Sequence, residues 1–137
     1  MHLRFIAAAA ILLTIASPAR AQQQRFTFDR SFDTASEVTV DVSTLGGAIS
    51  IRSGPPGKVA IHGTATVRLA INAPFNAVDV ARQIAAMPPI AREGDVIRLR
   101  PPSDPSQRRA ATVSYEVTVP PGTPVVAKSD SGAIAAD

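Results

Sequence analysis

The chain has 137 residues and a formal charge of +3, and it contains no cysteine. This length corresponds to one domain, and the lack of cysteine excludes disulfide bonds, thiolate metal sites and a lipid-modified cysteine. Basic and acidic residues are intermixed, and Arg108-Arg109 is the one tight basic pair. Because nucleic-acid-binding proteins carry clustered basic faces, a nucleic-acid partner is not expected.

The first 21 residues have the pattern of a secretory signal peptide. A short basic start is followed by an apolar run over residues 5–16 and by the small-x-small pattern Ala19-Arg20-Ala21. The run is shorter than the roughly 20 residues that a membrane span needs, and an uncleaved amphipathic anchor fits poorly because the segment has no polar face. We therefore predict cleavage of a Sec-type signal after Ala21, export to the periplasm or the cell surface, and no transmembrane segment afterwards. Cleavage removes two arginines and lowers the formal charge from +3 to +1.

Strand patterns open the remaining chain. Residues 25–30 alternate with two phenylalanines on one side, and in residues 36–42 three valines alternate with polar residues. Period-two alternation with β-branched residues predicts half-buried strands. The pattern resumes over 48–52 after a double glycine, turns at 53–57 (SGPPG), and continues as a long strand over 58–71.

The middle of the chain is different. Residues 76–87 begin with Asn76 at a helix N-cap position and end before Pro88-Pro89, which predicts one short α-helix. Residues 89–100 predict a hairpin with its turn at 93–95. Residues 101–109 contain three prolines within five positions, which argue against both helix and central strand, so we expect an exposed loop.

Alternation returns towards the C-terminus. In residues 112–120, Val113, Tyr115, Val117 and Val119 are expected to face inward, and a further strand follows a proline-glycine turn at 120–122. The predicted fold class is mainly β, with stacked strands in a β-solenoid or β-sandwich arrangement and one short inserted α-helix at about residues 76–87. Residues 22–137 are predicted to form a single β-rich domain.

No catalytic constellation is visible. His62 is the one histidine that remains after cleavage, and its alternation places it on the outward face of a strand, as an ordinary surface residue. A tetrahedral metal site would need carboxylates that converge on His62, and none is placed by sequence to do so. No serine lies in a G-x-S-x-G nucleophile elbow.

Two further patterns in the sequence have partial likeness to functional motifs. The stretch SGPPGK has the wrong glycine spacing for a phosphate-binding loop and lacks the Ser or Thr after Lys58, so a tight turn is expected. Asp41 and Glu116 lie on outward strand faces and are possible neighbours across stacked units, as in some carbohydrate-active β-helical enzymes, but a solvated polar face explains them better. We therefore predict no catalytic, cofactor-binding or metal-binding residues, no cofactor, and no enzymatic activity.

Two stretches of the chain share one pattern of strand, bend, S/T-x-x-G-A-I and strand: VTVDVSTLGGAISI (38–51) and VTVPPGTPVVAKSDSGAIA (117–135). Together with the hairpin sequence GDVI and with YEVTVPPG, these pieces resemble a bacterial adhesin-like family of exported domains of unknown function. The resemblance covers most of residues 25–137 and implies a β-solenoid with repeated G-x-I units. The family has no agreed catalytic residues, so none is carried over.

Similar proteins usually continue with several further units of the kind begun at Ser129. A stacked unit buries its apolar side only against its neighbours. The resemblance therefore implies that the domain is incomplete at its C-terminal end, and that the edge left there is liable to pair with other chains, including copies of itself.

These observations lead to a functional expectation with alternatives. The first is a non-enzymatic, exported adhesin-like or scaffold module of the bacterial cell envelope, whose polar faces make weak, multivalent contacts with glycans or envelope proteins. The second is a periplasmic partner-binding or envelope-stress sensing module that captures a peptide at an edge strand. A carbohydrate-active enzyme is the less favoured third.

Overall fold

The computed structural model describes residues 24–35, 37–69, 71 and 73–137. The predicted signal peptide lies outside the described residues. The elements are, in chain order, β1 (Arg25–Asp33), β2 (Thr39–Thr44), β3 (Ile49–Ser53), β4 (Lys58–Val67), α1 (Ala77–Ala86), β5 (Ile90–Glu93), β6 (Val96–Leu99), α2 (Pro105–Ala110), β7 (Ala111–Val119), β8 (Val125–Ser129) and β9 (Ile134–Ala136). The predicted mainly β fold class is confirmed.

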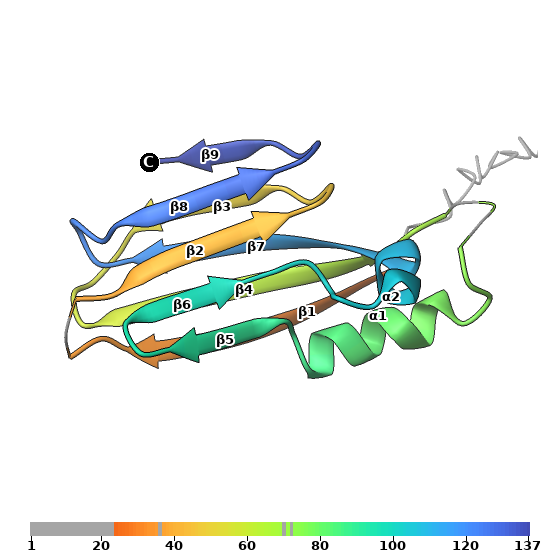
Figure 1. Ribbon diagram of the computed structural model, residues 1–137, viewed down its shortest axis with the longest axis horizontal. Coiled ribbons are helices and arrows are strands. Elements are labelled where there is room, and N and C mark those ends of the chain that lie inside the picture. Colours follow the sequence, from red (N-terminus) through yellow and green to blue (C-terminus); the bar gives the residue numbers. More distant parts are fainter. Residues whose placement is uncertain (1–23, 36, 70, 72) are drawn as a thin grey trace, which may run out of the picture.

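The strands form two sheets that pack face to face (Figure 1). The larger sheet has the order β1-β4-β7-β3-β9, and the smaller sheet has the order β5-β6-β2-β8. Alternate residues of each strand point into the space between the sheets, which accounts for the period-two pattern of the sequence. The two sheets thus enclose one apolar core.

Three strand pairs repeat along the two sheets. In β6/β7, β2/β3 and β8/β9, the first strand lies in the smaller sheet and the second in the larger one. Strand β2 pairs in parallel with both β6 and β8, and β3 pairs in parallel with both β7 and β9. Inward residues are therefore stacked in rows: Val40 lies between Ile97 and Val125, and Ile49 lies between Tyr115 and Ile134.

The other end of the two sheets is built differently. Strands β1 and β4 run antiparallel to each other, β4 runs antiparallel to β7, and β5 runs antiparallel to β6. Helix α1 packs against β1 and β4 at this end of the molecule (Figure 1). The Arg30 guanidinium of β1 donates to the Ala86 carbonyl at the last turn of α1, at 3.3 Å. This contact satisfies one of the carbonyls that a helix end leaves free and ties the helix to the sheet edge.

Tyr115 of β7 occupies the centre of the core. Its side chain is almost fully buried, and its hydroxyl donates to the Arg100 carbonyl at 3.1 Å, so the buried polar atom has a partner. The Phe28 ring meets it edge to face at a centroid distance of 6.1 Å. Phe28 in turn lies over Gly63, where any side chain would collide with the ring. An inward glycine on β4 therefore makes the room for the two large aromatic side chains.

Several element predictions need correction. Residues 101–109 are not all loop, because α2 begins at Pro105, with Asp104 accepting a hydrogen bond from the Ser106 N–H at 2.8 Å. Proline fits the first position of a helix, where its missing N–H would have no intrahelical partner. The strand predicted over 58–71 ends at Val67, because its antiparallel partners β1 and β7 begin opposite Thr66 and Val67. Leu69 lies beyond the strand and is 77% exposed.

The predicted helix at 76–87 is confirmed as α1, with small differences at its ends. Asn76 takes the N-cap position, but its side chain makes no capping hydrogen bond. The helix faces the sheets with Ala77, Val80, Ala81 and Ile84, whereas the apolar side chains of Phe75 and Met87 at its two ends are exposed.

Candidate functional site

The outer face of the larger sheet carries a polar row that crosses three strands. His62 of β4 lies opposite Asp29 of β1 on one side and opposite Glu116 of β7 on the other. The His62 Nδ1 atom is 2.8 Å from Asp29 Oδ1, so the imidazole donates to the carboxylate. On the far side of Glu116, Ser50 of β3 continues the row.

The prediction that His62 lies on an outward face is confirmed, since its side chain is 43% exposed. Its partner Asp29 was missed, because the sequence did not indicate that β1 pairs with β4. The alternation of RFTFDR, with Thr27 and Asp29 on the side opposite the phenylalanines, was the available signal. Thr64 and Ser114 lie directly opposite each other in the next row, so the predicted polar character of this face is also confirmed.

Asp41 and Glu116 do not come together. Asp41 belongs to β2 in the smaller sheet and Glu116 to β7 in the larger sheet, and both point outward. The core therefore separates them, and the possibility that they are neighbours across stacked units is wrong. The sequence pattern gave the correct face of each strand but did not assign the strands to sheets.

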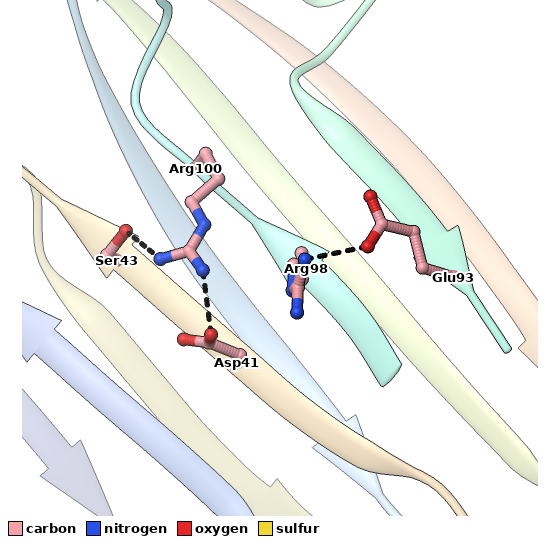
Figure 2. A network of polar contacts seen from close by, with 5 residues as sticks. All are labelled: Asp41, Ser43, Glu93, Arg98 and Arg100. Atoms are coloured by element: carbon pink, nitrogen blue, oxygen red, sulfur yellow. Dashed lines mark hydrogen bonds and ion pairs between the residues drawn. The ribbon is translucent and has the colours of Figure 1, made fainter. Parts of the chain in front are cut away.

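The outer face of the smaller sheet carries a second polar group, drawn in Figure 2. Arg100 donates to Asp41 Oδ2 at 2.8 Å and to Ser43 Oγ at 3.3 Å, and Arg98 donates to Glu93 Oε2 at 2.7 Å. The four charged side chains are between 25% and 64% exposed. Exposed ion pairs of this kind contribute little to stability, and they present alternating charges to solvent along β5, β6 and β2.

Among the residues that the structure describes, Asp104 and Tyr115 have shifted pKa values. Hydrogen bonds from the Ser106 hydroxyl and N–H lower the pKa of Asp104, which fits its role at the start of α2. Burial raises the pKa of the Tyr115 phenol, so it stays protonated and acts as a structural donor to the Arg100 carbonyl. Both groups are thus explained by the fold.

The stretch SGPPGK forms a turn, as predicted. Gly57 has φ +83°, a backbone conformation that favours glycine, and Lys58 begins β4 opposite Asp33. A shallow depression lies beside this turn, lined by the β7–β8 connection and by residues near the start of β2. Of the described residues that line it, Glu37 is the one with an ionisable side chain.

The repeated glycine phrases come together at one corner of the fold. Thr44 of β2 lies opposite Ser129 of β8, and the Thr44 hydroxyl donates to the Gly47 carbonyl at 2.6 Å. The Gly132 N–H donates to Ser129 Oγ at 2.8 Å, and a side chain at Gly132 would collide with the Gly47 carbonyl. The two phrases thus form similar bends that lie directly against each other, and the strand-bend-strand pattern that they share in the sequence is present in both.

Beyond β8 and β9, no further described strand covers the row of inward side chains. Val40 and Ile49 in the middle pair are 0% and 1% exposed, whereas Ile134 is 46% exposed and Val125 is only partly buried. Among the described residues, the apolar inward side chains at this edge are therefore less covered than those of the middle pair. We call β8 and β9 with their inward residues the open edge, and it is the candidate interaction site of the described chain.

In the part of the chain that the structure describes, no cluster of three or more histidine and carboxylate side chains has the geometry of a metal site. Within the same residues, no helix is long and apolar enough to span a membrane. Comparisons with family models, with curated proteins and with solved structures found no match to this chain.

Proposed function

We propose that this chain is an exported, non-enzymatic adhesin-like module of the β-solenoid type that serves as a scaffold in the bacterial cell envelope, in the periplasm or at the cell surface. The observation that carries the proposal is the repetition of strand pairs β6/β7, β2/β3 and β8/β9 in parallel register, with equivalent glycine bends at one corner. Repeated units of this kind build extended surfaces rather than enclosed sites.

The two outer faces support a role in weak, repeated contacts. The larger sheet presents rows of hydroxyl, carboxylate and imidazole groups, and the smaller sheet presents alternating arginines and carboxylates. Such groups form individually weak hydrogen bonds to glycans or proteins, and many of them together give useful avidity. Envelope glycans and proteins are therefore the proposed ligands.

The test is binding of the exported chain to purified cell wall and exopolysaccharide, with reducing ends measured in the same samples. We expect retention that weakens when the row on the larger sheet is changed by Glu116→Ala together with Thr64→Ala. Val126→Ala, on the outer face of the other sheet, is the matched control and should bind like the unchanged chain. Release of reducing ends would instead identify a carbohydrate-active enzyme, and lack of retention on either material would remove the adhesin-like role.

A second candidate is a partner-binding module in which a strand pairs with the open edge. The partly exposed Val125 and Ile134 favour it, because an added strand would cover them while it gains backbone hydrogen bonds. Recovery of a defined envelope protein by the unchanged chain, but not by an edge variant such as Ala127→Pro, would support this candidate over adhesion through the outer faces.

A further inference from the structure

We propose that the open edge pairs with the open edge of a second copy of this chain, so that two copies form a two-fold dimer. This inference rests on the second candidate function, strand pairing at β8 and β9, and names the partner. It is independent of the polar outer faces and of the adhesin-like role.

The backbone groups of β8 are the first support. The Val40 N–H donates to the Pro124 carbonyl and the Asp130 N–H donates to the Thr44 carbonyl, which fixes the phase of the parallel ladder between β2 and β8. In a parallel ladder, every second residue of a strand directs its N–H and carbonyl groups to one neighbouring strand, and the residues between direct theirs to the other side. Val125, Ala127 and Ser129 therefore direct these groups away from β2. An edge strand with free groups of this kind is a template for another strand.

Strand β9 presents the same kind of edge in the other sheet. The Ile49 N–H donates to the Ala133 carbonyl and the Asp137 N–H donates to the Ile51 carbonyl, both near 3 Å. The intervening alternation leaves Ile134 and Ala136 with N–H groups that point away from β3. A single strand from another protein would cover only one of the two sheets, whereas a second copy brings two strands and can cover both.

The directions of the two strands suit a symmetric partner. Strands β8 and β9 run in opposite directions at the same end of the molecule (Figure 1). A two-fold axis that brings two such edges together aligns the strands antiparallel, whether each strand meets its own copy or β8 meets β9. Antiparallel pairing is slightly more stable per residue than parallel pairing, and two-fold dimers are the commonest symmetric assemblies.

The side chains at the edge are compatible with self-pairing. The inward positions are apolar and only partly covered: Val125, Ala127, Ile134 and Ala136. A second copy brings the same apolar set, so each copy covers the exposed end of the other's core. If β8 pairs with its own copy about Ala127, Lys128 faces Val126 of the second copy, and two lysines do not oppose each other.

The experiment is sedimentation velocity over a concentration series of the chain. The full sequence is expressed, so that any cleavage of its first residues takes place in the cell before purification. We expect a reversible monomer–dimer equilibrium. Ala127→Pro removes an N–H that points away from β2, so the β2–β8 ladder is kept while the dimer loses the same donor in both copies. Its dimer dissociation constant should rise at least about tenfold. Asp41→Asn, on the outer face of the neighbouring strand β2 and one strand away from the edge, is the control and should leave the constant unchanged.

A second measurement needs no variant. In hydrogen exchange of the unchanged chain, the N–H groups of Val125, Ala127 and Ser129 should exchange more slowly as the concentration rises, while those of β1 should not change. A chain that stays monomeric at its highest soluble concentration overturns the inference, and so does a dimer that Ala127→Pro leaves intact. If that monomer still recovers an envelope protein through the open edge, the second candidate function stands and only the identity of the partner is wrong.

Discussion

The two ends of the stacked strands differ in how their apolar rows are finished. At one end, antiparallel strands β1 and β5 and helix α1 close the core, and Phe28 is only 4% exposed. At the other end, the open edge leaves Ile134 46% exposed and Val125 partly buried. An inward apolar residue is therefore expected to contribute more to the free energy of unfolding near the closed end than near the open edge.

The largest expected effect is the difference in unfolding free energy between an alanine substitution in one glycine bend and the same substitution in the other. In Gly47→Ala the added Cβ would collide with the Val113 backbone carbonyl, in a bend held between two neighbouring strand pairs. Urea unfolding should show a loss of about 3 kcal/mol or more, since neither neighbour can move freely. In Gly132→Ala the clash is with the Gly47 carbonyl, but β9 has no described strand on its outer side and can shift. We expect a global loss below about 1 kcal/mol, with local loosening of β9.

Gly46→Ala is the matched control for this comparison. It is the same substitution at the adjacent glycine, where the nearest atom to the new Cβ would be Ser131 Oγ at an ordinary 3.5 Å. Its unfolding free energy should stay within about 0.5 kcal/mol of the unchanged chain. Equal losses for Gly47→Ala and Gly132→Ala would mean that the two bends are equally confined, which contradicts the difference between the ends.

The second prediction compares two valines of one row. Val40 and Val125 are register partners on adjacent strands, yet Val40 is 0% exposed and Val125 is partly buried. Val40→Ala should cost about 2–3 kcal/mol through lost burial and a residual cavity. Val125→Ala should cost less than about 1 kcal/mol when unfolding is measured at a concentration low enough to keep the chain monomeric. A similar cost for both would show that the open edge is covered in solution.

The sequence predicted the strands well because a half-buried strand alternates apolar and polar residues along the chain. The alternation of Val38, Val40 and Val42 gave the correct inward face, and the repeated phrase around Gly47 and Gly132 gave two bends between strands. These features depend on local pattern or on direct repetition, both of which can be read along the chain.

The sequence pattern did not show which distant strands pair with each other. The contact between His62 and Asp29 depends on β1 lying against β4, and the separation of Asp41 from Glu116 depends on the sheet to which each strand belongs. Helix α2 was missed because proline was weighed as a helix breaker, although Pro105 stands at the one end of a helix that tolerates it. The candidate site itself, the open edge, is defined by what the neighbouring strands leave uncovered, which only the assembled sheets reveal.

A third prediction concerns pH and the centre of the core. Burial raises the pKa of the Tyr115 phenol in the folded chain above the ordinary value of about 10 that it regains on unfolding. Above that value the unfolded chain loses the proton while the folded chain keeps it, so stability should fall as the pH rises beyond about 10. Tyr115→Phe should cost about 1 kcal/mol at neutral pH, from the lost hydrogen bond to the Arg100 carbonyl. The same variant should also flatten the alkaline decline in urea-unfolding midpoints; an equally steep decline would assign it to other groups.

The smallest expected effect lies on the outer face of β2, between the two ends. Asp41 accepts from Arg100 at 2.8 Å, and the two side chains are 25% and 47% exposed, so solvent screens most of their attraction. Asp41→Asn keeps the shape of the side chain and should cost about 0.5 kcal/mol, a difference that shrinks further in high salt. Asp41 lies on β2, with Val126 of β8 between it and the edge, and its carboxylate points away from the core. The monomer–dimer equilibrium should therefore not change. A changed equilibrium in Asp41→Asn would mean that the second copy reaches the outer face of the smaller sheet, so that pairing of the open edge would no longer account for the whole contact.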